Sequence, residues 1–298
     1  MNTSDVMIGP ASHYYISQRL RLHYVDWGND QATPLVMVHG GRDHCRNWDW
    51  VAQILRTDYH IIAPDLRGHG DSQWAVGSAY QLSDYVVDLA QLIHQKFPGE
   101  KISLMGHSLG GTIALIFAGL YPDKVKKVIS IEGLGADPDL RRQLKRPPSE
   151  RILEHVEVLR NLAGRIPPRY NTIEECVSRM QQANPRLTPG RARHLTIHGV
   201  NQNEDGTFTW KFDNYTRTFG PSNFTNEELG KIWTAINCPV LFLYGEESFM
   251  EFLRRGNPTR HIKECENTGI EFAGHWVHHD ALRPFLEVTL RFLGTRQR

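Results

Sequence analysis

Short apolar stretches alternate with longer amphipathic ones through the first half of the chain. Stretches such as 35–38 and 61–63 are apolar throughout and end at turn residues, which is typical of strands buried on both faces of a sheet. The predicted strands cover 19–26, 35–38, 61–63, 102–105 and 125–131. The predicted helices cover 48–56, 83–97 and 109–120. This alternation predicts an α/β fold with a mainly parallel, doubly wound sheet that carries helices on both faces.

The alternation stops after Gly135, and a different pattern begins. Residues 137–236 contain 8 of the chain's 16 prolines and no clear strand before 208–210. Apolar positions at helical spacing recur in this segment, at 149–162, 172–182 and 189–198. We therefore expect 137–236 to be an inserted, mostly helical cap subdomain.

The strand pattern returns after the predicted insertion. Apolar stretches occur at 239–244 and near 270–273, and a closing helix is predicted over about 280–293. The core domain is therefore expected to combine 1–136 with 237–298. The full length of 298 residues suits one large α/β domain with such an insertion.

Composition excludes several classes of protein. Lys and Arg number 34 and Asp and Glu 33, a net charge of +1 that argues against nucleic-acid and membrane-surface partners. The opening residues lack a signal-peptide pattern, and no apolar run is long enough to span a membrane. The four cysteines are far apart with no CxxC pair, so we expect reduced thiols, a cytoplasmic protein and no metal site.

The segment 106–111, with the sequence GHSLGG, carries the sharpest chemical signal. It is a G-x-S-x-G motif between a predicted strand and a predicted helix, which is the setting of a nucleophile elbow. Such a tight turn holds the Ser108 hydroxyl clear of the sheet at a helix N-terminus, and the crowding requires glycine two residues before and after it. Ser108 is therefore the candidate nucleophile.

A serine hydroxyl needs a base, and the resulting oxyanion needs hydrogen-bond donors. His275 lies just after the last apolar run, in the chain order Ser, acid, His that this type of elbow uses. His278 and His279 are rivals that run toward the closing helix. The backbone amides of Leu109 and Gly41, the latter in the His-Gly-Gly loop after 35–38, are the expected oxyanion donors.

Together, these motifs resemble those of the α/β-hydrolase fold family. The resemblance rests on HGG at 39–41, DLRGHGDS at 65–72, the elbow at 106–111 and GHW at 274–276, in the family's order. It covers 20–135 and 239–293 and implies that the insertion between them is the cap. A serine nucleophile in this fold implies acyl transfer without a cofactor.

The acid is where the chain departs from that pattern. Many members carry Asp in a G-x-x-D turn after the strand that matches 239–244, and here Ser248 occupies that position. Two repairs are open. Glu132 at the end of 125–131 is favoured, because some family members place a carboxylate there, and Glu246 or Glu247 is the alternative.

These residues predict a serine hydrolase of the carboxylesterase type. We expect it to act on small to medium esters as a monomer or homodimer, with Ser108, His275 and Glu132 as the catalytic triad. A lactonase or C–C bond hydrolase would use the same residues, because the cap sets the shape of the pocket. A cofactor-independent oxygenase and a ligand-binding, receptor-like protein also remain open.

Overall fold

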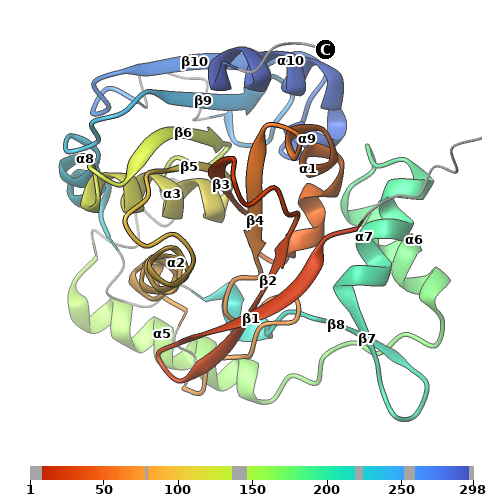
Figure 1. Cartoon of the computed structure of the whole chain (residues 1–298). Coiled ribbons are helices and arrows are strands. Elements are labelled where there is room, and N and C mark those ends of the chain that lie inside the picture. Colours follow the sequence, from red (N-terminus) through yellow and green to blue (C-terminus); the bar gives the residue numbers. More distant parts are fainter. Residues whose placement is uncertain (1–8, 78–79, 136–145, 219–223, 252–258, 295–298) are drawn as a thin grey trace, which may run out of the picture.

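The computed structural model describes residues 9–77, 80–135, 146–218, 224–251 and 259–294 (Figure 1). Within these residues, eight strands form one sheet in the order β1-β2-β4-β3-β5-β6-β9-β10. The strands are β1 (Ala11–Ser17), β2 (Leu20–Asp26), β3 (Thr33–Val38), β4 (Tyr59–Pro64), β5 (Ile102–His107), β6 (Val125–Ile131), β9 (Val240–Gly245) and β10 (Cys265–Ile270). Strand β2 is antiparallel to both β1 and β4, and the other pairs are parallel. The predicted mainly parallel, doubly wound sheet is confirmed.

Alternate residues of the buried strands face two different layers of helices. In β3, Val36 and Val38 join one core cluster, whereas Leu35 and Met37 join the other. The first layer contains α2 (Leu82–Lys96), α3 (Leu109–Leu120) and α8 (Asn226–Trp233). The second layer contains η1 (Cys45–Trp48), α1 (Asp49–Leu55), α9 (Val277–Asp280) and α10 (Leu282–Leu293). Burial on both faces explains why β3, β4 and β5 read as continuous apolar runs.

The chain between β6 and β9 is largely helical. Its elements are α5 (Pro148–Ala163), α6 (Ile173–Ala183), α7 (Pro189–Gly199), the hairpin β7 (Val200–Gln202) and β8 (Phe208–Trp210), η2 (Asn214–Arg217) and α8. Figure 1 shows α6 and α7 beside one another at one side of the sheet, and α5 at its lower margin. The first boundary expected for the cap, between 136 and 137, lies outside the described residues.

Several elements differ from the sequence-based expectation. The strand expected near 270–273 was placed too late, because β10 ends at Ile270 and the following Phe272 has a positive φ of 58°. Strand β10 contains polar residues and a glycine, and it forms because its backbone pairs with β9. Strands β1 and β7 and helix α8 were not predicted at all. The closing helix expected over about 280–293 is α10, and the short helix α9 before it was not expected.

Candidate active site

Ser108 occupies a strained turn between β5 and α3. Its φ of 51° and ψ of −115° lie in a region that side-chain-bearing residues rarely adopt. The Ser108 amide donates to the Ile131 carbonyl at 2.7 Å, which anchors the turn to the end of β6. The glycines are sterically required, because a Cβ at Gly106 would lie 2.3 Å from the Gly110 carbonyl oxygen and one at Gly110 would lie 2.2 Å from that of Val38.

Glu132 and His275 are joined by a hydrogen bond. His275 Nδ1 lies 2.9 Å from Glu132 Oε2, although 143 residues separate them in the chain. Glu132 follows β6 directly and is 1% exposed. Its Oε1 accepts from the Gly245 amide at 2.8 Å, and its Oε2 accepts from the Ser248 hydroxyl at 2.6 Å. Because both oxygens accept hydrogen bonds, the ionised carboxylate suits this place, and it holds the His275 proton on Nδ1.

The sheet explains why Glu132 and His275 lie at the elbow. Strands β5 and β6 are parallel neighbours that pair His107 with Ile131, so the next residues, Ser108 and Glu132, lie at the same edge of the sheet. His107 Nε2 donates to the His275 carbonyl oxygen at 2.9 Å. This bond ties the loop that carries His275 to the residue before Ser108.

The alternative acids have other neighbours. Glu247 forms an ion pair with Arg186, which precedes α7. Glu246 Oε1 lies against Gly269 on β10, where an added Cβ would come within 2.0 Å of it. Among the described residues, Glu132 is the carboxylate that binds His275. Ser248, at the position where many α/β-hydrolases have Asp, donates a hydrogen bond to Glu132.

The rival histidines are buried behind His107: the centroid of the His278 ring lies 4.9 Å from that of His107, and within the described residues neither His278 nor His279 bonds to Glu132. His278 Nε2 hydrogen-bonds to Asn47 Oδ1, and its ring stacks on Trp48 with centroids 4.7 Å apart. His279 is 2% exposed, and its ring packs edge-on against Trp50. Both residues belong to the packing between η1, α1 and α9.

The His-Gly-Gly loop after β3 runs beside Ser108. A Cβ at Gly40 would lie 3.3 Å from Ser108 Cβ, whereas one at Gly41 would meet open space. His39 Nδ1 donates to the Gly40 carbonyl at 2.6 Å, and its Nε2 accepts from the Leu66 amide at 3.0 Å. The carbonyl and the next amide of a trans peptide point in opposite directions, so the Gly41 N–H lies on the side away from His39.

Leu109 lies at the first position of α3, where backbone N–H groups have no partner within the helix. Leu109 directly follows Ser108, and Gly40 brings the loop that carries Gly41 beside it; oxyanion donation by the Gly41 and Leu109 amides stays a prediction. The supporting roles of His39, His107 and Ser248 were missed at the sequence level. His39 belonged to a motif already noted, and Ser248 occupied the position expected for the acid.

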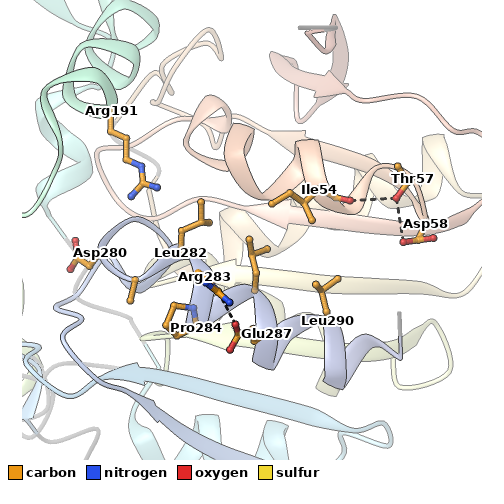
Figure 2. A pocket seen from close by; sticks show the side chains of 12 residues that line it. Ile54, Thr57, Asp58, Arg191, Asp280, Leu282, Arg283, Pro284, Glu287 and Leu290 are labelled. Atoms are coloured by element: carbon orange, nitrogen blue, oxygen red, sulfur yellow. Dashed lines mark hydrogen bonds and ion pairs between the residues drawn. The ribbon is translucent and has the colours of Figure 1, made fainter. Parts of the chain in front are cut away.

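A groove of about 740 Å³ extends between Asp58 and Asp280 (Figure 2). It is formed by α1, α10 and Arg191 of α7, and Ser108, Glu132 and His275 are not among its lining residues. Asp280, at one end of the groove, accepts a hydrogen bond from the Gly274 amide at 2.8 Å. The groove therefore borders the loop that carries His275. The candidate nucleophile Ser108 does not line it.

Three groups of potential metal ligands occur among the described residues, all outside the elbow. They are His23 with Cys45 and Asp65, Asp49 with His194 and His198, and Asp26 with Asp30 and His60. Hydrogen bonds or ion pairs already join members of each group: His23 to Asp65, His194 to Asp49, and His60 to Asp26. A cation would have to displace these partners.

Several histidines are buried in neutral form, which predicts sensitivity to acid. Burial lowers the pKa of His39 to about 3 and that of His69 to about 4, and it lowers the pKa of His107 and His278 well below the usual value. The unfolded chain therefore binds more protons than the folded chain below about pH 6.5, and stability is lost as the pH falls from there toward 4. Each such group contributes a slope of up to about 1.4 kcal/mol per pH unit. Burial raises the pKa of Asp43 to about 7 and also raises the pKa of Asp88 and Asp280, which gives slopes of the opposite sign that offset part of this loss.

Urea unfolding at pH 7.5, 6 and 5 measures this effect. We expect the free energy of unfolding to fall steeply between the last two values. Equal unfolding midpoints at pH 7.5 and pH 5 would contradict neutral burial of these histidines.

Among the described residues, no helix has both the length and the apolar character needed to cross a membrane.

Comparison with known proteins gives a consistent family. A serine hydrolase-like protein of Danio rerio is 28% identical over 192 residues, which cover 63% of this chain and 57% of that protein. The chain thus spans little more than half of that relative's length. The 3-hydroxybutyrate-oligomer hydrolase of Cupriavidus necator is 33% identical over 280 residues, which cover 86% of this chain and 88% of that enzyme.

A solved structure shares the fold across almost the whole chain. The thioesterase domain from the curacin biosynthetic pathway superposes with a TM-score of 0.82 at 22% identity, covering 95% of this chain and all of that domain. The family model for the alpha/beta hydrolase fold matches residues 33–282. The elbow, the sheet order and this match lead to one conclusion: the chain belongs to the alpha/beta hydrolase fold family.

Proposed function

We propose that the chain is a serine hydrolase that cleaves carboxylic esters of small to medium acyl substrates. The observation that carries the proposal is the Glu132–His275 hydrogen bond at the edge of the sheet where the strained Ser108 elbow lies. A nucleophile beside a base that is oriented by a buried carboxylate is the pattern of covalent acyl transfer.

In the first half of the reaction, Ser108 Oγ attacks the ester carbonyl carbon and passes its proton to His275 Nε2. Glu132 stabilises the imidazolium through its hydrogen bond to Nδ1. The Leu109 and Gly41 amides hold the oxyanion that forms. The C–O bond to the alcohol then breaks, and the alcohol leaves with the proton from His275.

In the second half, His275 takes a proton from water as the water attacks the acyl-enzyme. The acid is released when His275 returns that proton to Ser108 Oγ. Every proton therefore moves through Nε2 of His275. This nitrogen can accept a proton because Glu132 keeps the other ring proton on Nδ1.

An exposed aromatic side chain supports an acyl substrate with apolar surface. The Phe249 ring is 77% exposed, and its centroid lies 5.0 Å from that of His275. A large exposed apolar side chain beside a candidate base favours contact with a hydrocarbon part of a substrate. The names of the relatives agree with this class: one is an oligomer hydrolase, and another is an esterase of Mycobacterium tuberculosis.

We also propose that the inserted segment 137–236 acts as a cap over Ser108 and His275. Leu187, Ala192 and Leu195 form a small apolar cluster, against which Trp276, the neighbour of His275, packs. Arg186 pairs with Glu247 in the turn that also carries Ser248. The segment therefore contacts both loops that position His275, and residues 1–136 and 237–298 form the core beneath it.

Labelling with a fluorophosphonate probe tests the proposal. A brief exposure to less than one equivalent of probe should place one adduct on the native protein, and peptide mapping should locate it at Ser108. A folded Ser108→Ala variant should not take up the probe under these conditions. Labelled protein should lose its hydrolytic activity. The relative rates of unlabelled protein on an ester, a thioester and a lactone separate an esterase from a lactonase. An adduct elsewhere, with Ser108 unmodified, would refute the assignment.

A further inference from the structure

A second serine, histidine and aspartate lie in line on β1, on β2 and directly after β4. Ser12 Oγ is 2.7 Å from His23 Nε2, and His23 Nδ1 is 2.7 Å from Asp65 Oδ2. Ser12 is exposed on the edge strand β1, whereas His23 on β2 and Asp65 after β4 are buried. In the described part of the chain, Ser108, Glu132 and His275 form no hydrogen bond or ion pair with these three residues, although Asp65 Oδ1 lies 4.0 Å from Nε2 of His39, which belongs to the loop beside Ser108.

The strand register produces this arrangement. Strand β1 pairs Tyr14 with His23, which makes Ser12 the diagonal neighbour of His23 on the same face. Strand β2 pairs Tyr24 with Pro64, so His23 comes opposite Asp65, one residue further on. The alignment therefore depends on three neighbouring strands of the sheet, which are more rigid than loops.

Asp65 is held as a hydrogen-bond acceptor. Its Oδ1 accepts from the Cys45 amide at 2.7 Å, and its Oδ2 accepts from the Asp71 amide at 2.9 Å as well as from His23. Burial alone would raise the pKa of Asp65, but the hydrogen bond from His23 leads the opposing effects, and the pKa of Asp65 lies well below the usual range. An ionised carboxylate cannot donate, so His23 carries its proton on Nδ1.

The consequence for Ser12 follows from the two ring nitrogens. In neutral His23 the single proton is on Nδ1, so Nε2 has a free lone pair to which the Ser12 hydroxyl, 2.7 Å away, can donate. A hydroxyl that donates to an imidazole oriented by a buried carboxylate has the geometry of an activated nucleophile.

A small cavity adjoins these three residues. Its volume is about 90 Å³, and Ser12, His23, Cys45, Arg46 and Asp65 are among the residues that line it. That volume corresponds to about three water molecules at roughly 30 Å³ each. It suits an acetyl-sized group rather than a long acyl chain.

We propose that Ser12 is a second nucleophile, which accepts a small acyl group from an ester independently of Ser108. A bond forms between Ser12 Oγ and the acyl carbon, and the ester C–O bond breaks. The Ser12 proton passes to His23 Nε2 and from there to the departing alkoxide or phenolate, which leaves as alcohol or phenol. The product is a chain acylated on Ser12.

The experiment uses 4-nitrophenyl acetate on the full chain carrying Ser108→Ala, so that the outcome does not depend on the proposed hydrolase function. Peptide mapping over time measures acetylation at Ser12 and at Ser83, an exposed serine on α2 that serves as the matched control. We expect Ser12 to be acetylated at least about 100-fold faster than Ser83, the smallest gain usual for a positioned general base. In a folded His23→Gln variant this excess should disappear.

A second measurement does not rely on a variant that could unfold. In urea above the unfolding midpoint, acetylation at Ser12 should slow to the rate of Ser83, because the alignment with His23 is lost. The proposal is overturned if folded protein acetylates both serines at the same rate. It is also overturned if the excess at Ser12 persists in urea or in folded His23→Gln protein.

Discussion

Replacement of Ser108 by alanine is expected to lower kcat/KM for ester hydrolysis by about 10⁵-fold, as loss of a nucleophile does in serine hydrolases of known mechanism. The acyl-enzyme cannot form without Oγ, and the remaining oxyanion donors account for only part of the rate. The change leaves the backbone strain as it is, because alanine meets the same restriction as serine at a φ of 51°.

Kinetics on a chromogenic ester and urea unfolding of both proteins measure these two expectations. Ser83→Ala on α2 is the matched control and should keep native kinetics. Retention of more than about a hundredth of the activity by a folded Ser108→Ala protein would exclude Ser108 as the nucleophile, given the usual size of the effect.

Replacement of Glu132 by glutamine is expected to lower kcat by about 10³- to 10⁴-fold with a small effect on KM. The Gly245 amide donates to Oε1, so the glutamine oxygen takes that position and its amide group faces His275. That group donates to Nδ1, which forces the histidine proton onto Nε2, where it blocks the base. The volume and packing of the side chain change little.

The matched control is Glu247→Gln, which removes an exposed carboxylate from the same region and breaks the ion pair with Arg186. It should reduce kcat by less than about threefold, because an exposed ion pair contributes little. If Glu247→Gln caused the large loss and Glu132→Gln the small one, the acid would belong to the turn after β9.

Ser248 offers a rescue for the same experiment. Its hydroxyl lies 2.6 Å from the Glu132 oxygen that binds His275, so an aspartate at 248 in the Glu132→Gln background comes within reach of the ring. The double variant Glu132→Gln with Ser248→Asp should regain at least about tenfold of the lost kcat, since an oriented carboxylate is restored. A double variant no faster than Glu132→Gln would show that position 248 cannot orient His275.

The core elements and the elbow could be predicted from the chain because each leaves a pattern within one short segment. Strands β3, β4 and β5 are buried on both faces, so most residues in each of them are apolar. The elbow requires glycine at fixed distances from Ser108, since the clashes at Gly106 and Gly110 involve neighbouring turns of the same segment and the adjacent strand.

The edge strands were harder to predict because their residues are not buried on both faces. Strand β1 exposes most of its side chains, and β10 contains polar residues and Gly269. Both strands exist because a neighbouring strand supplies backbone hydrogen bonds. Such pairing joins residues that are distant in the chain or weakly patterned, so propensity alone does not indicate it.

The contacts among the functional groups depend on the order of strands in the sheet. Sequence reasoning left three carboxylates open, and folding brings Glu132 to His275 across 143 residues while Glu247 turns to Arg186. Ser12, His23 and Asp65 are likewise aligned by the registers of β1, β2 and β4. Residue types and spacing along the chain determine strands, helices and the strained serine, because those depend on near neighbours. Which carboxylate meets which imidazole is a matter of three-dimensional packing, because it depends on strands that are brought together only when the sheet forms.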